Sequence, residues 1–120
     1  MNISPAIPIL RIFSVDKARE FYFDFLGFRL DWEHTFGDNF PLYMQISRSG
    51  LTLHLTEHFG DATPGSAVYI PIDDAHALQK ELIAKDYRHA KPGVVEEDWA
   101  RQVRLTDPFG NRLVFSESKE

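Results

Sequence analysis

The chain has 120 residues, of which 43% are hydrophobic and 13% aromatic, which is enough for the core of one globular domain. It contains no cysteine, which excludes disulfides, cysteine-based zinc sites and thiolate catalysis and favours a cytoplasmic location. The net charge of -5, with Lys and Arg spread along the chain, argues against a nucleic-acid partner and favours a cationic one.

The N-terminal stretch MNISPAIPIL lacks the basic start and long apolar segment of a secretory signal. No apolar run reaches the roughly 20 residues that a spanning helix needs, so no membrane partner is expected. The first strand is predicted at Ile7 to Phe13.

A helix is predicted after this strand, because apolar residues recur there at helical spacing. The stripe consists of Ala18, Phe21, Tyr22, Phe25 and Leu26. We expect Asp16 to cap the start of the helix and Gly27 to end it. The aromatic residues of the stripe are interpreted as core rather than as a binding cage.

Extended structure is predicted from Phe28 onward. One strand is expected around Trp32 and another at Leu42 to Arg48, separated by the chain-breaking segment FGDNFP. A further strand, LTLHLTE, should pack one face under a helix through Leu51, Leu53 and Leu55. Its opposite, open face is predicted to consist of Thr52, His54 and Thr56.

The second half of the chain is predicted to copy the first. GNRLVFSE, from Gly110 to Glu117, matches GLTLHLTE, from Gly50 to Glu57, at an offset of sixty residues, which places Val114 where His54 stood. The copy begins with a strand at Ala67 to Ile72. A helix should follow, with Asp73 or Asp74 as its cap, a stripe of Ala75, Leu78 and Leu82, and Asp86 in the place of Gly27.

These elements predict two βαβββ modules in a single domain, residues 1–120. The first module covers about residues 5–58, the linker 59–65 and the second module about 66–118. The TDPFGN turn near the end is interpreted as structural, since Pro and Gly suit its backbone and Asp107 and Asn111 can bond to it.

The sequence resembles the vicinal oxygen chelate superfamily, also called the glyoxalase and bleomycin-resistance superfamily, over nearly its whole length. The resemblance rests on AIPILRIFSVDKAREFYFDFLGF, on WARQVRLTDPFGNRLVF and on the paired βαβββ pattern. It implies an α+β fold whose modules form a curved mixed sheet. In metal-using relatives it implies ligands at positions occupied here by Ile7, His54, Ala67 and Val114. Only His54 can coordinate a metal, so no metal or other cofactor is predicted.

The metal-free branch that the chain most resembles is that of the bleomycin resistance proteins. The resemblance implies a small acidic dimer that sequesters the drug unchanged. AIPIL with Pro8, LGFRLDW and Trp99 carry this likeness. Pro8 is similar to the hinge proline of that family, which implies that the first strand can be exchanged between subunits.

The lead hypothesis is therefore a non-catalytic homodimer that binds bleomycin-type cationic antibiotics in grooves at its interface. Stacking aromatic residues and negative charge suit such a ligand. The predicted ligand-binding residues are Asp31, Trp32, His54, Thr56, Tyr69 and Trp99. The acidic residues predicted to attract the cation are Asp31, Glu33, Glu96, Glu97 and Asp98.

Two alternatives remain open at this point. One is a glyoxalase-like or dioxygenase-like enzyme with a displaced metal, held for instance by His54 with Glu57 or His58. The other is a binder of a different small molecule, since one fold serves many functions.

Overall fold

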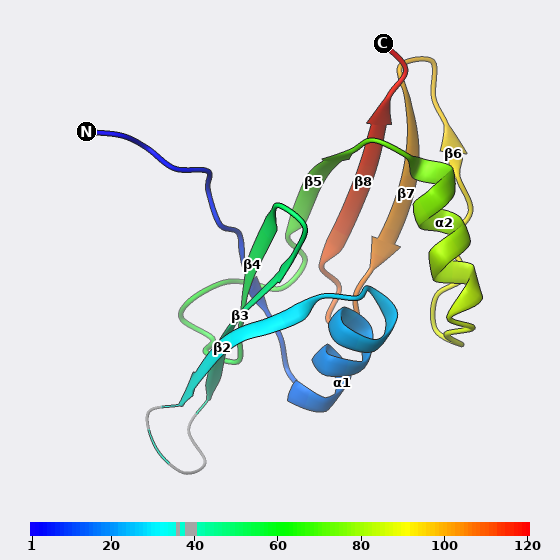
Figure 1. Ribbon diagram of the computed structural model, residues 1–120. Coiled ribbons are helices and arrows are strands. Elements are labelled where there is room, and N and C mark those ends of the chain that lie inside the picture. The colour runs from blue at the N-terminus through cyan, green and yellow to red at the C-terminus, as the bar shows by residue number, and fades with distance from the viewer. Residues whose placement is uncertain (36, 38–40) are drawn as a thin grey trace. The chain divides into compact units, whose positions relative to one another are not determined.

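The computed structural model describes residues 1–35, 37 and 41–120. Its contacts divide the chain into two compact units, Met1–Pro64 and Gly65–Glu120 (Figure 1). Each unit contains one helical segment and one four-stranded mixed sheet in the order βαβββ, which confirms the predicted α+β architecture. No helix in the described ranges is long and apolar enough to cross a membrane.

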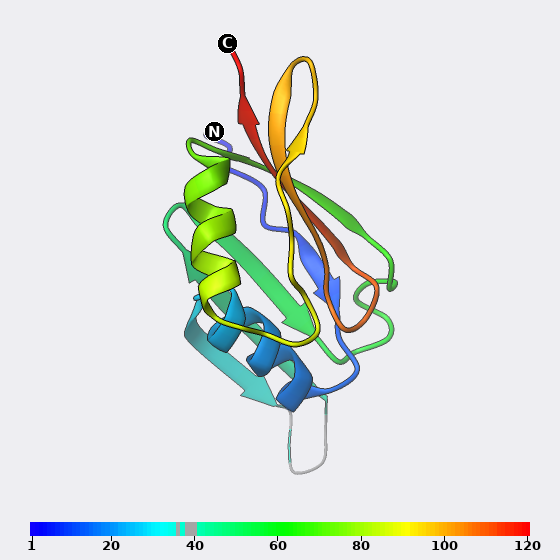
Figure 2. The ribbon, with the colours of Figure 1, turned by 90° about the vertical axis from the view of Figure 1, so that its right-hand side faces the viewer.

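The first unit has the sheet order β1-β4-β3-β2. Its strands are β1 (Ile9–Arg11), β2 (Arg29–Thr35), β3 (Leu42–Arg48) and β4 (Leu51–Thr56). β1 runs parallel to β4 (Figure 2), and the other pairs are antiparallel. The predicted breaker FGDNFP, between β2 and β3, falls mostly outside the described residues.

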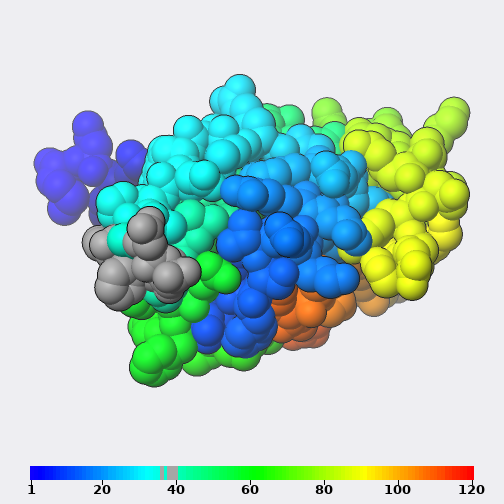
Figure 3. Space-filling model, turned by 90° about the horizontal axis from the view of Figure 1, so that it is seen from below, coloured from blue at the N-terminus to red at the C-terminus, as the bar shows by residue number. Residues whose placement is uncertain are grey.

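β1 is shorter than the sequence predicts, since it starts at Ile9 instead of Ile7. The preceding Pro8 has no N–H to donate to a neighbouring strand, although its carbonyl accepts a hydrogen bond from His54 N at 2.9 Å. The residues before Pro8 are exposed and stand out from the surface of their unit (Figure 3). Strand exchange at Pro8 stays a prediction.

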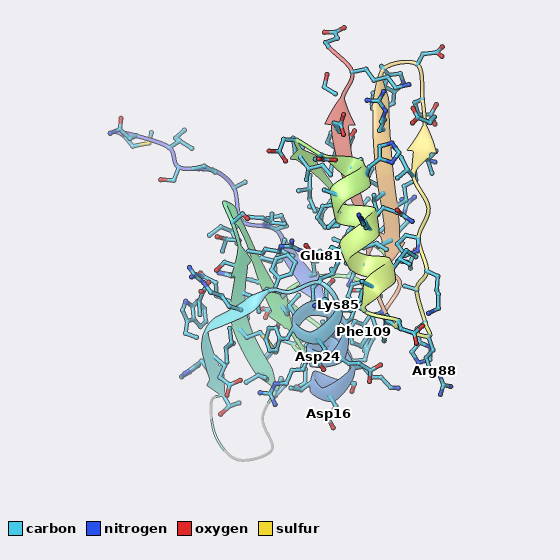
Figure 4. All side chains as sticks on the ribbon, turned by 45° about the vertical axis from the view of Figure 1, so that its right-hand side comes forward. Asp16, Asp24, Glu81, Lys85, Arg88 and Phe109 are labelled. Carbon is cyan, nitrogen blue, oxygen red and sulfur yellow. The ribbon has the colours of Figure 1, made fainter. Side chains whose placement is uncertain are left out.

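The first helix begins as α1 (Val15–Arg19) and continues as a π-helical turn, η1 (Glu20–Phe25). Its N-cap is Ser14, whose Oγ accepts from Lys17 N at 3.2 Å. The prediction that Asp16 caps the helix is wrong, because Asp16 already lies inside the first turn, where it is exposed (Figure 4). The predicted apolar stripe is confirmed as buried, and Gly27 ends the helix with a φ of 72°.

The second unit has the sheet order β5-β8-β7-β6. Its elements are β5 (Ala67–Ile72), α2 (Ala75–Ala84), β6 (Val95–Glu96), β7 (Ala100–Thr106) and β8 (Arg112–Ser118). α2 packs along β7 and β8 (Figure 2). Asp74 caps α2 by accepting from Ala77 N, and Asp86 takes the left-handed conformation of Gly27, with a φ of 52°.

The register of the two sheets confirms the internal repeat. Ile9 of β1 lies opposite His54 of β4. Tyr69 of β5 lies opposite Val114 of β8. Both members of the second pair follow their counterparts by sixty residues, so Val114 is the structural twin of His54.

The turn between β7 and β8 is organised by the buried carboxylate of Asp107. Its Oδ1 accepts from the backbone N–H groups of Phe109 and Asn111, each at 2.9 Å. Its Oδ2 accepts from the side-chain amide of Asn111 at 2.9 Å. Gly110 adopts a φ of 90°, which side chains disfavour. The predicted turn is therefore confirmed, with Asp107 as its centre.

The packing face of β4 is confirmed at Leu53 and Leu55, which are fully buried, while Leu51 is half-buried. On β8, Leu113 is fully buried and Phe115 is 7% exposed. The predicted open face is wrong at Thr56, which is also fully buried. The Thr56 hydroxyl donates to Asp61 Oδ2 at 2.8 Å and accepts from His58 N at 3.0 Å. Both bonds tie the segment after β4 to the strand, which removes this hydroxyl from solvent.

Candidate functional site

Three aromatic side chains meet on the open face of the first sheet. Trp32 of β2 and Tyr43 of β3 are stacked, with ring centroids 6.0 Å apart and planes inclined by 9°. The His54 ring of β4 meets both edge-on, at 5.4 Å from Trp32 and 5.1 Å from Tyr43. Trp32 is 43% exposed, so this aromatic cluster offers a partly open apolar surface.

A β-bulge aligns Trp32 with this cluster. Leu30 pairs with Ile46, but Trp32 pairs with Gln45, which leaves Asp31 as an extra residue in β2. Because of the extra residue, Trp32 lies across from Gln45, which itself lies across from His54. Asp31 and Trp32 are both used on the open face, which simple alternation along β2 would not allow.

A continuous chain of hydrogen bonds runs through this face. Tyr43 Oη lies 2.7 Å from His54 Nδ1, and Gln45 Oε1 lies 2.9 Å from His54 Nε2. Gln45 Nε2 donates to Asp31 Oδ2 at 3.1 Å. Burial lowers the pKa of His54, and burial followed by the charge of Asp61 raises the pKa of Tyr43. Both effects favour the neutral forms of the two rings.

The Asp31 carboxylate ends this chain and is fully engaged. Its Oδ1 accepts from the Ser47 hydroxyl at 2.9 Å and lies 3.3 Å from Arg29 Nε. The hydrogen bond from Gln45, then that from Ser47, lowers the pKa of Asp31. Asp31 is thus a fixed anion within the sheet face.

Most of the acidic residues predicted to attract a cation form ion pairs. Glu33 pairs with Arg19 at 2.9 Å and Glu97 with Arg104 at 3.0 Å. Glu96 contacts Arg101 and Lys119, at 3.2 Å and 2.9 Å, and these contacts lower its pKa, the hydrogen bond from Lys119 most. Such contacts between distant residues cannot be read from a local charge count. These ion pairs reduce the negative charge that Glu33, Glu96 and Glu97 can offer to a cationic ligand, and the predicted attraction of a cation stays a prediction.

The open face of the second sheet carries Tyr69, which is 56% exposed, as its predicted position beside Ala67 requires. Its hydroxyl bonds to Ser116 Oγ at 2.8 Å, and Ser116 Oγ also accepts from Gln102 Nε2 at 3.1 Å. Gln102 in turn accepts from Arg104 Nε at 2.9 Å. Tyr69 is therefore held at its tip while its ring remains accessible.

Trp99, the remaining predicted aromatic contact, lies in the turn between β6 and β7 and is 55% exposed. Its carbonyl accepts from Lys119 N at 3.1 Å, which anchors the turn to the end of β8. The ring is accessible, and its role in ligand binding stays a prediction.

The metal-ligand positions inferred from the family hold one coordinating side chain, and both of its ring nitrogens face Tyr43 and Gln45. Of the displaced alternatives, Glu57 accepts from Leu42 N at 3.0 Å. Within the described ranges, the structure brings together no three His, Asp or Glu side chains that could hold a metal.

Sequence analysis missed Tyr43 and Gln45, which complete the cluster with His54. Both residues alternate with the apolar Leu42, Met44 and Ile46 in β3. That alternation was available as a signal, because Tyr43 and Gln45 occupy the face opposite the buried residues. Their partner could be identified only from the register of β3 against β4.

The family model for glyoxalase superfamily proteins matches residues 1–120. No protein of curated function matches the sequence. Among solved structures, the bleomycin-binding protein of the bleomycin producer Streptomyces verticillus, complexed with copper(II)-bleomycin, is 26% identical with a TM-score of 0.72, over 99% of both chains.

Two further structures share the fold. TnmS3, an antibiotic binding protein from Streptomyces sp. CB03234, is 24% identical with a TM-score of 0.75, over 99% of both chains. A bleomycin resistance determinant encoded on the transposon Tn5 is 19% identical with a TM-score of 0.72, over 98% of this chain and 100% of the other. With the paired βαβββ units and a family match along its full length, the chain belongs to the glyoxalase superfamily.

Proposed function

We propose that this protein binds bleomycin-type antibiotics and sequesters them without altering them. The observation that carries the proposal is the partly open cluster of Trp32, Tyr43 and His54 on the face of the first sheet. The planar heteroaromatic groups of such a drug can stack on this surface, and its cationic groups can meet the ring faces.

The polar groups beside the cluster favour a ligand that donates hydrogen bonds. Asp31 is an anion, and Tyr43 and His54 are neutral groups with lowered tendency to ionise. A cationic glycopeptide supplies many N–H donors. Similarity to a protein whose structure contains copper(II)-bleomycin supports the same class of ligand.

The proposal assigns binding instead of catalysis. His54, the one coordinating side chain at the inferred metal positions, is already held by Tyr43 and Gln45. These bonds orient the ring as part of a binding surface. We further propose that the chain works as a homodimer with ligand grooves at its interface, and that the exposed Tyr69 and Trp99 rings contribute ligand contacts.

Calorimetric titration of the 120-residue chain with metal-free and with copper(II)-loaded bleomycin tests the proposal, together with the mass of the complex. We expect saturable binding of one drug per chain in a dimer, and recovery of the drug with unchanged mass. Trp32→Ala should lose affinity, by about 1 to 3 kcal/mol for a stacking residue, whereas Ile83→Ala, an exposed apolar residue on α2, should not. Absence of heat with both forms of the drug would refute the proposed ligand class.

A further inference from the structure

We infer that the hydrogen bonds linking Asp31, Gln45, His54 and Tyr43 all run in one fixed direction, so that Tyr43 Oη accepts a hydrogen bond from the ligand. Asp31 is then a positioning residue that acts through the other three and does not pair with the ligand directly. The inference names the chemical class of ligand for the site described above, and in that respect it rests on the proposed function.

The direction of the chain is set at Asp31. An ionised carboxylate can only accept hydrogen bonds, and its two oxygens face the Ser47 hydroxyl at 2.9 Å and the Gln45 amide nitrogen at 3.1 Å. Reversing the Gln45 amide would place its oxygen against the carboxylate. The carboxylate therefore fixes the Gln45 orientation, with nitrogen toward Asp31 and oxygen toward His54.

The same reasoning fixes the tautomer of His54. Gln45 Oε1 is a carbonyl oxygen and can only accept, so His54 Nε2, at 2.9 Å, carries the proton. The neutral ring then has no proton on Nδ1. Burial of the ring, which lowers the pKa of His54, favours this neutral form.

The bare Nδ1 fixes the hydroxyl of Tyr43 in turn. At 2.7 Å from Nδ1, the hydroxyl donates a hydrogen bond to the ring and keeps its proton. Its oxygen keeps acceptor lone pairs, and none of the described side chains or backbone groups donates to it. Tyr43 is half-buried and stacks against Trp32, so the inferred place of the ligand donor is at this oxygen, beside the Trp32 ring.

The ligand group that fits this arrangement is a planar hydrogen-bond donor, such as an amidine, guanidine or amide. It can stack on the aromatic pair and donate to Tyr43 Oη. A carboxylate of the same size would face the lone pairs of Tyr43 and the charge of Asp31. The site should therefore discriminate by polarity between ligands of equal shape.

The tautomer can be measured without any ligand. In the nitrogen-15-labelled protein at about pH 8, above the ordinary histidine pKa, two-bond nitrogen–proton spectra should show His54 with its proton on Nε2. Asp31→Asn introduces an amide that can donate to Gln45, which frees Gln45 to rotate, so the Nε2–H form should lose its exclusive population. Glu33→Gln removes a neighbouring charge that takes no part in these hydrogen bonds, and it should leave the tautomer unchanged. A proton on Nδ1 in the wild type, or an unchanged tautomer in Asp31→Asn, would overturn the inference.

Ligand polarity is tested with benzamidine and benzoate, which share a ring and differ in donor and acceptor character. The Trp32 indole resonance reports binding, and Trp99→Phe assigns it. We expect about tenfold tighter binding of benzamidine than of benzoate, and a clearly smaller ratio in Tyr43→Phe, where only the charge of Asp31 still separates the two probes. Equal binding in the wild type, an unchanged ratio in Tyr43→Phe, or no response to either probe would overturn the inference. Loss of bleomycin binding alone, with the probe preference intact, would overturn the proposed function and leave this inference standing.

Discussion

Replacement of the buried Asp107 should show how far one carboxylate organises the turn between the last two strands. Asp107→Ala removes the acceptor for two backbone N–H groups and one amide N–H, all at 2.9 Å. Leaving buried donors without partners costs about 1 to 3 kcal/mol each, and partial access of water to the turn reduces their sum. We expect a loss of about 3 kcal/mol in the free energy of unfolding.

The graded variant Asp107→Asn separates the three bonds. It retains an acceptor oxygen for the two backbone groups and sets its amide nitrogen against the Asn111 amide, so the expected loss is about 1 kcal/mol. Asp73→Ala, at an exposed aspartate that does not cap α2, should change stability by less than about 0.5 kcal/mol. Urea unfolding measures all three, with an unchanged denaturant slope as the condition for comparison. If Asp107→Ala and Asp73→Ala unfold at the same urea concentration, the account of this turn is wrong.

Three further outcomes are expected. Trp99→Ala should weaken bleomycin binding by about 1 to 3 kcal/mol, measured by calorimetry, and unchanged affinity in the folded variant would remove Trp99 from the site. Ser14→Ala should cost about 1 kcal/mol in thermal or urea unfolding, while Asp16→Ala should cost clearly less, because Ser14 is the cap. His54 should titrate by NMR below its ordinary pKa of about 6.5, since burial lowers its pKa. The unfolded chain then takes up the proton first, so the His54 contribution to stability is present above about pH 6.5 and is lost as pH falls toward the folded pKa. A midpoint at or above 6.5 would contradict this.

The sequence was sufficient for the features that depend on short periods and on the repeat. Alternation with period two predicted the buried Leu53 and Leu55, and the sixty-residue offset predicted that Val114 occupies the position of His54. Helical spacing predicted the buried stripe of the first helix. Each of these follows from regular backbone geometry, in which the position of a residue determines its face.

The features that sequence analysis missed depend on irregular backbone or on distant partners. The bulge at Asp31 changes the face of every later residue in β2, and no local composition marks it. Thr56 is buried because Asp61 and the backbone of His58 return to its hydroxyl. The charge of Glu33 is balanced by Arg19, fourteen positions earlier in the chain. All three required knowledge of how separate segments meet.

The two units, although copies of one pattern, use a glutamine on the open face in opposite electrostatic settings. In the first unit, Gln45 donates to the anion Asp31 and presents its oxygen to His54. In the second, Gln102 accepts from the cation Arg104 and presents its nitrogen to Ser116. In each unit, the charged side chain that bonds to the glutamine determines which way the glutamine amide is oriented.

The side chain between each glutamine and its tyrosine determines whether the direction of the tyrosine hydrogen bond is also fixed. Neutral His54 has one donor and one acceptor nitrogen, so fixing one fixes the other, and Tyr43 must donate inward. The Ser116 hydroxyl can accept from Gln102 and still either donate to Tyr69 or accept from it. His54→Gln should therefore allow the Tyr43 hydroxyl to donate to a ligand as well as to accept from it. Arg104→Gln should cause no such change at Tyr69, whose hydroxyl can already do either.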